Sequence, residues 1–153
     1  MTAQRPPFDA LPLRKDGPHG NAWGLYGLDD QLGALNLLTP QVRAAAAAEI
    51  VDGTSVSTDL PLDYMSRPCF GRAAFQHSIK TKTPRVVNDD TLCFNTQSSS
   101  QWDGFRHYGY QKEGLYYNGR TPEDIANSKV NGIHGMHAEC TLVAALLYAL
   151  RNY

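Results

Sequence analysis

The sequence lacks the features that mark several large classes of protein. Its 14 lysines and arginines face 15 aspartates and glutamates, so no excess positive charge favours nucleic acid as a partner. Its three cysteines form no CxxC pair, which favours reduced thiols over a disulfide framework. No apolar run follows the N-terminus, and the longest run, residues 142–150, is well below the ~20 residues of a membrane span. We therefore expect a cytoplasmic protein that binds neither nucleic acid nor membrane.

The chain of 153 residues suits one domain with a buried core, preceded by an irregular segment. Residues 1–21 contain four prolines and two glycines without a sustained period, which predicts an extended N-terminal arm before a domain over 22–153. Residues 23–38 place apolar side chains at helical spacing, which predicts a helix despite its glycines. Asp29 and Asp30 would then lie in its first turn, where they either cap the helix or face a polar pocket.

Three further helices are predicted from capping signals and composition. Thr39 and Pro40 suit the N-cap and first position of an alanine-rich helix. Thr121 begins another helix, and Asp124 stands where it can return the hydrogen bond of a capping box. From about His137 the chain is almost entirely apolar, which predicts a C-terminal helix that needs cover and is a possible surface for homo-oligomerisation.

Between the helix predicted to begin at Thr39 and the one predicted to begin at Thr121, the composition favours short strands. Candidate strands are residues 54–64, residues 73–81 and a strand within residues 85–96 that ends near Phe94, because β-branched and aromatic residues alternate there between turn signals. Residues 88–90, Asn-Asp-Asp, are typical of a turn. His77, on the second candidate strand, is interpreted as an edge histidine or, as an alternative, a site residue.

Residues 92–119 concentrate the side chains that can do chemistry. Six of the protein's fifteen Phe, Trp and Tyr residues lie between Trp102 and Tyr117, with Asp103 and His107 four positions apart. This pair is open to three interpretations: a base with its orienting carboxylate, two metal ligands, or a hydrogen-bonded surface pair. A nucleophile from the run Ser98, Ser99 and Ser100 with His107 is a further alternative, although the run lies in no GxSxG elbow. A metal role for His134 and His137 is a weaker hypothesis, since no further ligand completes the set.

Two segments, WGLYGLDDQLGALNLLTP and NTQSSSQWDGFRHYGYQKEGLYYNG, carry a resemblance to a known family. Together they resemble the cyclase family that includes bacterial kynurenine formamidase and isatin hydrolase, and within it the fungal branch. The resemblance implies an α/β fold, a swivelling β/β/α domain. It also implies an arylformamidase-like hydrolase that uses a divalent metal, zinc or manganese, to cleave a C–N bond in an aryl formamide or cyclic amide.

The family's metal signature, HxGTHxDxPxH, can be followed residue by residue in this sequence. Its two histidine ligands correspond to Gln97 and Gln101, and its aspartate ligand to Asp103. Its proton-transferring histidine corresponds to His107. The resemblance further implies substrate contacts from the following residues: Ser100, Trp102, Phe105 and Tyr108.

The sequence differs from the family in its metal ligands and in its length, and these two differences leave two hypotheses open. An amide oxygen is a weaker ligand than an imidazole, so glutamine at positions 97 and 101 should remove most of the affinity for zinc. What remains is either an oxygen-rich site for manganese, magnesium or calcium, or no metal site. Family members also continue beyond this chain, whose tail diverges from about residue 135, so we expect only the N-terminal half of the domain. The first hypothesis is a metal-dependent amide hydrolase; the alternative is an inactive truncated fold that serves as a binding module or has no function.

Overall fold

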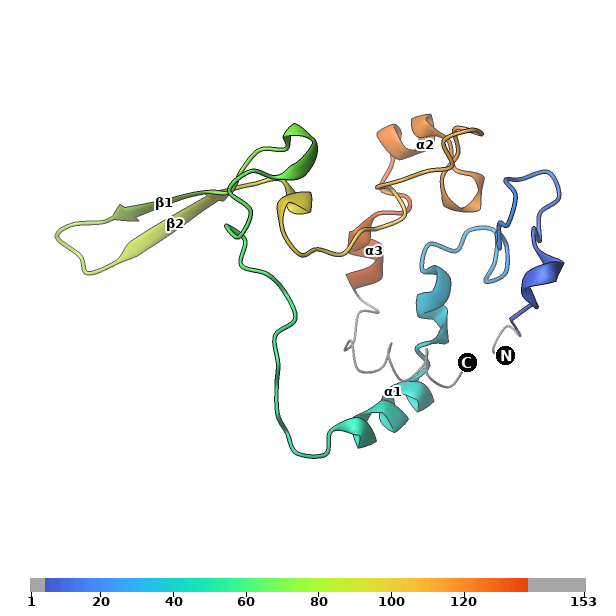
Figure 1. Cartoon of the computed structure of the whole chain (residues 1–153), viewed down its shortest axis with the longest axis horizontal. Helices are drawn as coiled ribbons and strands as arrows, with labels where there is room; N and C mark the ends of the chain where they lie inside the picture. The colour runs from blue at the N-terminus through green and yellow to red at the C-terminus, as the bar shows by residue number, and fades with distance from the viewer. Residues whose placement is uncertain (1–4, 138–153) are drawn as a thin grey trace. The chain divides into compact units, whose positions relative to one another are not determined.

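The computed structural model describes residues 5–137, which divide into two compact units (Figure 1). The first unit is formed by Met1–Thr54 together with Asp103–Tyr153, and the second by Ser55–Trp102. The predicted boundary between an arm and a domain at residue 21 stays a prediction. Short helices precede and follow one pair of consecutive strands, so the described chain is a small mixed α/β protein, which agrees with the predicted class.

The first unit is helical in the part of the chain that the structure describes. Its α-helices are α1 (Pro40–Ala46), α2 (Pro122–Asn127) and α3 (Ile133–His137). Short 3-10 helices accompany them at Phe8–Ala10, Gly33–Leu37, Ala47–Glu49 and Tyr117–Gly119. Within residues 5–137, no helix has the length and apolar character needed to cross a bilayer. The predicted apolar C-terminal helix, and the oligomer contact expected of it, lie outside the described residues.

Helix α1 begins where the sequence predicted. The Thr39 hydroxyl accepts a hydrogen bond of 3.3 Å from the Val42 backbone N–H, and Pro40 occupies the first turn. A side-chain acceptor here satisfies one of the N–H groups that a helix start leaves unpaired. Ala46 is buried together with Leu38, so the small side chains of α1 let it pack closely on the preceding segment.

The helix predicted over residues 23–38 is wrong for most of its length. Only Gly33–Leu37 is helical, as a short 3-10 turn. Gly24, Gly27 and Gly33 have φ of 80°, 111° and 56°, outside the right-handed helical region. The apolar residues at helical spacing therefore belong to a series of turns, because these glycines reverse the chain direction before a helix can propagate.

Trp23 forms part of the buried centre of this unit. Its side chain is 4% exposed and meets Tyr110 edge-on, with ring centroids 5.5 Å apart. Just before it, the fully buried Asn21 donates through its side chain to the carbonyls of Arg14 and Pro18, at 2.9 and 2.6 Å. The loop that leads into Trp23 is thus held by an internal hydrogen-bonded turn.

The second unit contains an antiparallel hairpin, β1 (Gln76–Thr81) and β2 (Asn88–Cys93). Two of the three predicted strands are confirmed, whereas residues 54–64 form no strand. The turn predicted at residues 88–90 is also wrong, since these residues begin β2. The chain reverses earlier, where Arg85 N–H donates to the Lys82 carbonyl at 2.9 Å.

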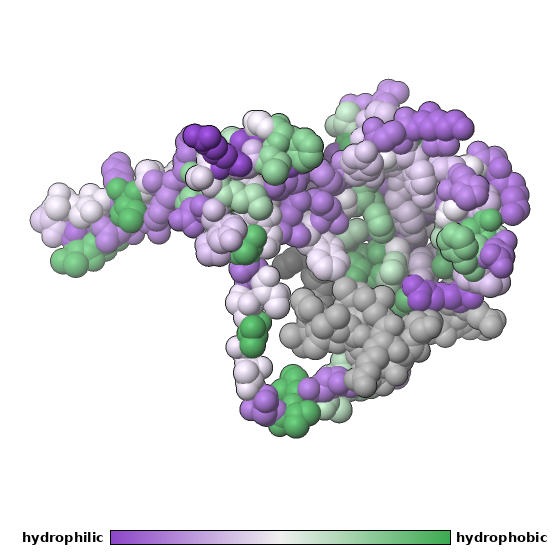
Figure 2. Space-filling model, in the orientation of Figure 1, coloured by the Kyte–Doolittle hydropathy of each residue, from purple (hydrophilic) through white to green (hydrophobic). Residues whose placement is uncertain are grey.

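Cross-strand charge pairs explain why an acidic sequence forms β2. Asp90 lies opposite Ile79 and forms an ion pair with His77 at 3.5 Å, and Asp89 lies opposite Lys80 and forms an ion pair with Lys82. Every residue of both strands is exposed. Figure 2 shows this hairpin as mostly hydrophilic, with separate hydrophobic side chains rather than one continuous patch. His77 is therefore an exposed strand histidine, as the sequence favoured.

Candidate functional site

Asp103 and His107 lie on one turn of the first unit. The His107 N–H donates to the Gly104 carbonyl at 3.0 Å, which brings the two side chains to the same side of the turn. His107 Nε2 is 3.8 Å from Asp103 Oδ2, and the two side chains are 35% and 45% exposed. This distance allows charge attraction but exceeds that of a direct hydrogen bond. The pair is accessible to a ligand from solvent.

The turn that carries this pair is hydrogen-bonded to the C-terminal end of α2. The Arg106 guanidinium donates to the carbonyls of Ile125 and Ser128, the latter at 3.2 Å. A Cβ on Gly104 would lie 3.0 Å from the Ile133 backbone nitrogen, so this position needs glycine or a shift of the backbone. The sequence thus fixes the position of the Asp103–His107 pair through its immediate neighbours, Gly104 and Arg106.

Gln97 and Gln101 belong to the second unit. Gln97 lies in the 3-10 helix Thr96–Ser98, where the Asn95 side chain accepts a hydrogen bond of 2.9 Å from the Gln97 N–H. Gln97 is half-buried and Gln101 is exposed. Metal binding by these glutamines with Asp103 stays a prediction.

The chemistry of the four predicted residues still defines which ion they would fit. Within the described chain, no group of three or more histidine, cysteine, aspartate and glutamate side chains is placed to hold a metal. One carboxylate, one imidazole and two amide oxygens make a donor set dominated by hard oxygen. Such a set fits manganese or magnesium better than zinc, which favours nitrogen and sulfur.

The hydroxyls of the three consecutive serines all form hydrogen bonds with backbone groups. Ser98, 1% exposed, donates to the Asn95 carbonyl at 2.6 Å, and Ser99 donates to the Leu60 carbonyl at 3.1 Å. Ser100 Oγ accepts a hydrogen bond of 2.9 Å from the Leu60 N–H. These bonds fix the loop near Leu60 against the serine run, so the hydroxyls have a structural role that the serine-nucleophile alternative did not anticipate.

The three aromatic residues expected to contact substrate differ in their surroundings. Trp102, in the second unit, is 57% exposed, and Tyr108, in the first, is 74% exposed. Phe105 instead stacks on Tyr117, with ring centroids 4.2 Å apart and planes inclined by 25°. A Cβ on Gly33 would lie 2.6 Å from Phe105 Cζ, so the glycine makes room for the ring. Phe105 and Tyr117 together line a cavity of about 650 Å³.

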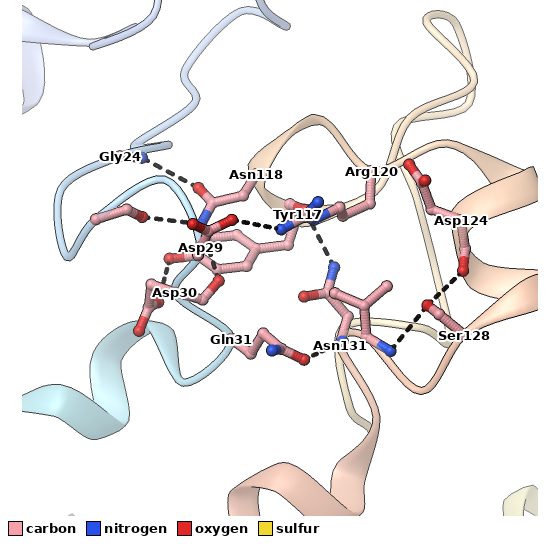
Figure 3. Close-up of polar contacts among 12 residues, drawn as sticks. Gly24, Asp29, Asp30, Gln31, Tyr117, Asn118, Arg120, Asp124, Ser128 and Asn131 are labelled. Carbon is pink, nitrogen blue, oxygen red and sulfur yellow. Dashed lines mark hydrogen bonds and ion pairs between the residues drawn. The ribbon is translucent and has the colours of Figure 1, made fainter.

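A set of polar contacts that sequence reasoning missed joins residues 24–31 to residues 117–131 (Figure 3). Asn118 makes three of them. Its Oδ1 accepts from the Gly24 N–H at 3.0 Å, and its Nδ2 donates to the carbonyls of Gly27 and Asp30 at 3.1 and 2.8 Å. Asn118 has φ of 56°, which asparagine tolerates better than most residues. The Asn-Gly dipeptide signals a turn in the sequence, but nothing local identifies its distant partners.

Asp30 and Tyr117 provide a second link in this set. The Tyr117 hydroxyl donates to Asp30 Oδ2 at 2.7 Å, and the same oxygen accepts from the Gly33 N–H at 2.7 Å. Asp30 also accepts from the Leu32 N–H at 3.3 Å, but the N-cap of the Gly33–Leu37 helix is Leu32, so Asp30 is not the helix cap that the sequence predicted. Burial, then the hydrogen bond to Asp30, raises the pKa of the Tyr117 hydroxyl well above its usual value. Asp29 forms an ion pair with Arg120 at 3.0 Å.

Comparison with known proteins shows a similarity to a solved structure. No family model matches the chain, and no curated protein is similar to it. A solved structure described as a novel cyclase superposes on 67% of the chain with a TM-score of 0.59 and 29% sequence identity. The chain spans 37% of the length of that cyclase chain. Over two thirds of its length, the chain is therefore similar to a cyclase in both fold and sequence.

Proposed function

We propose that the chain contributes the Asp103–His107 side of a metal-dependent amide hydrolase site. The observation that supports this proposal is the pairing of His107 Nε2 with Asp103 Oδ2 at 3.8 Å, on an accessible turn of a chain similar to a cyclase. The substrate would be an aryl formamide or a cyclic amide. Because the chain spans 37% of the matched cyclase, the activity proposed is that of a site to which further residues contribute.

In this proposal Asp103 would hold a divalent ion, with Gln97 and Gln101 as weak oxygen ligands. A bound divalent ion would supply Lewis-acid activation of water for attack on an amide carbonyl. The donor set favours manganese over zinc, for the reasons given above. The assay should therefore be carried out with manganese added.

His107 would move the proton that amide cleavage requires. Its imidazole would accept a proton from the attacking water and donate one to the departing nitrogen. His107 Nε2 lies 3.8 Å from Asp103 Oδ2, so the proton-transferring imidazole would lie beside the residue proposed to hold the ion. The turn fastened by Arg106 would keep the imidazole in place, since a positioned base depends on its supporting contacts.

The side chains expected to contact substrate would act through apolar surface. Trp102 and Tyr108 are exposed aromatics, and Phe105 forms a fixed stack with Tyr117. Aromatic faces favour flat aryl groups by offset stacking. Ser100, already bonded to Leu60 N–H, would contact substrate only through its remaining hydrogen-bond capacity.

The test combines metal binding with turnover. Purified chain would be titrated with Mn²⁺ by calorimetry and assayed for hydrolysis of N-formylkynurenine with and without Mn²⁺. We expect Mn²⁺ binding that Asp103→Asn weakens about tenfold or more, and Mn²⁺-dependent turnover that His107→Ala reduces by about 10²–10⁴-fold.

The chain contains a matched control pair for both measurements. His77 and Asp90 form an exposed histidine–aspartate contact at 3.5 Å on the hairpin, outside the proposed site. His77→Ala and Asp90→Asn should leave Mn²⁺ affinity and turnover unchanged. Because further residues contribute to the complete site, the proposal fails on metal binding: it is wrong if wild-type chain does not bind Mn²⁺, or if the two pairs of variants behave alike.

A gain of function tests the two glutamines directly. In the proposed site, replacing both by histidine would restore two imidazole donors, so Gln97→His with Gln101→His should raise Zn²⁺ affinity by about tenfold or more. The affinity would be measured by competition with a zinc dye. Unchanged zinc affinity in the double variant would remove these positions from the ligand set.

A further inference from the structure

The two units of the chain differ in what holds them together. The apolar side chains buried in the first unit include Trp23, Leu37, Leu38, Ala46 and Met136. Among residues 55–102, all of which the structure describes, the one buried residue is Ser98, which is polar. Burial of apolar surface is the dominant favourable contribution to folding. The second unit therefore lacks the main source of stability that the first unit has.

The hairpin of the second unit does not replace a core. Every residue of β1 and β2 is exposed, including Ile79 and Leu92, which are 62% and 48% exposed. At the base of the hairpin the Phe75 and Phe94 rings meet with centroids 6.0 Å apart, but Phe94 remains 36% exposed. A two-stranded hairpin without a covering layer is marginally stable in water. The strands therefore add little to the stability of this unit.

Polar contacts join the two ends of the second unit. The Ser99 hydroxyl donates to the carbonyls of Leu60 and Pro61, at 3.1 and 3.0 Å, and Ser100 Oγ accepts from the Leu60 N–H at 2.9 Å. We call these contacts the serine clasp. They connect residues 38 to 40 positions apart, with the whole hairpin between them. A hydrogen bond that water can replace contributes only modestly to stability, so the clasp can open at little cost.

We propose that the second unit opens by itself while the first unit stays folded, and that the serine clasp sets how often it opens. Segments with few buried apolar groups and exposed hydrogen bonds unfold locally at much lower free energy than a packed core. Ser99 and Ser100 lie between Gln97 and Gln101 in the sequence, so each opening releases the segment that carries both glutamines. The inference concerns the order of this unit and depends on neither a metal nor hydrolysis.

The test is amide hydrogen exchange of the full-length chain, followed residue by residue by NMR. In the second unit the Tyr64 N–H donates to the Pro61 carbonyl at 3.1 Å and the Ser98 N–H to the Asn95 carbonyl at 2.9 Å. In the first unit the Gly33 N–H donates to Asp30, and the Asn131 N–H to Gln31, each at 2.7 Å. After correction for intrinsic rates, the first two amides should exchange roughly 100-fold faster than the last two.

A double variant tests the clasp. Ser99→Ala with Ser100→Ala removes its hydroxyls but keeps the acceptors of the Tyr64 and Ser98 amides, so their faster exchange would report opening of the unit. We expect exchange of these two amides to rise about tenfold, with no change at Gly33. Unchanged exchange in the first unit would also show that the variant chain still folds.

Two controls make the outcome decisive. Ser99→Thr with Ser100→Thr keeps both hydroxyls and should exchange like wild type. Ser128→Ala removes a serine hydroxyl of the first unit, which donates to the Asp124 carbonyl at 2.6 Å, and should leave exchange in the second unit unchanged. Equal protection of the two units in wild type would overturn the inference. So would a double-alanine variant that exchanges like wild type, or one in which both units accelerate together.

Discussion

The Tyr117 hydroxyl donates a hydrogen bond of 2.7 Å to Asp30, a residue 87 positions earlier in the chain. This contact connects the turn before the Gly33–Leu37 helix with the 3-10 helix Tyr117–Gly119. It also holds one member of the Phe105–Tyr117 stack. The first unit therefore depends on a polar contact between its two sequence-distant halves, and four predictions follow from that contact and its neighbours.

Tyr117→Phe tests the hydrogen bond and its pH dependence. At pH 7 we expect a loss of about 1.5 kcal/mol in the free energy of unfolding, because a hydrogen bond to a carboxylate is removed from a half-buried site. The folded state raises the pKa of this hydroxyl above its usual 10.0. Its stabilising contribution is therefore complete below pH ~10 and is lost as pH rises through the folded pKa.

Urea denaturation between pH 7 and pH 11 would measure both effects. Wild-type chain should lose stability above pH ~10 more steeply than Tyr117→Phe. Tyr64→Phe, which removes the hydroxyl of a tyrosine that is 65% exposed, is the matched control and should follow wild type. Parallel curves for wild type and Tyr117→Phe would contradict the prediction.

Gly33→Ala tests the space that the Phe105 ring needs. The added methyl would lie 2.6 Å from Phe105 Cζ at a φ of 56°, so we expect a loss of about 2–4 kcal/mol from the clash and the left-handed backbone together. Gly53→Ala is the control for backbone strain without a clash, since Gly53 has a φ of 72° and a methyl group there would have no atom within 4 Å. It should cost about 1–2 kcal/mol.

A double variant separates the clash from other causes. Phe105→Leu shortens the side chain that the new methyl meets, so Gly33→Ala should cost less in that background than in wild type. Thermal melts of the four chains in the cycle would measure the coupling. Additive losses would show that Phe105 is not the reason for glycine at position 33.

Asn118→Gly tests the three side-chain hydrogen bonds to residues 24–30. Glycine keeps the φ of 56° without strain, so the change removes the hydrogen bonds and adds only the backbone entropy of glycine. We expect a loss of about 2–3 kcal/mol in the free energy of unfolding, from three bonds of about 1 kcal/mol each. Asn127→Gly, which replaces an asparagine at the end of α2, is a comparison for the backbone entropy of glycine. Equal losses from the two variants would contradict the role assigned to Asn118.

Asp124→Asn tests the capping box of α2. The Thr121 backbone N–H and then its hydroxyl donate to the Asp124 carboxylate, and both lower the pKa of that carboxyl below its usual 3.8. A carboxyl with a lowered folded pKa stabilises the protein above the unfolded pKa and loses that contribution as pH falls through the folded pKa. Wild-type stability should therefore fall between pH 4 and pH 2 more than that of Asp124→Asn. Equal losses of stability in the two chains between pH 4 and pH 2 would contradict the prediction.

The sequence by itself determined the elements whose causes lie within a few residues. Thr39 with Pro40, and Thr121 with Asp124, begin α1 and α2 as predicted, because a cap bonds to an N–H two or three positions away. The hairpin strands follow from alternation, although their turn lies at residues 82–85 rather than at residues 88–90. The Asp103–His107 pair was evident from spacing alone, and the structure places it on one turn.

Only the tertiary structure shows which segments distant in the sequence contact one another. Asn118 meets residues 24–30, and Phe105 stacks on Tyr117 in the space left by Gly33, through contacts that no local pattern encodes. The apolar spacing of residues 23–38 predicted a helix, but left-handed glycines and the bonds to Asn118 fix turns there instead. The physical reason is that a periodic pattern specifies only the buried face of a segment, while the partner that buries it lies up to about a hundred residues away in the chain.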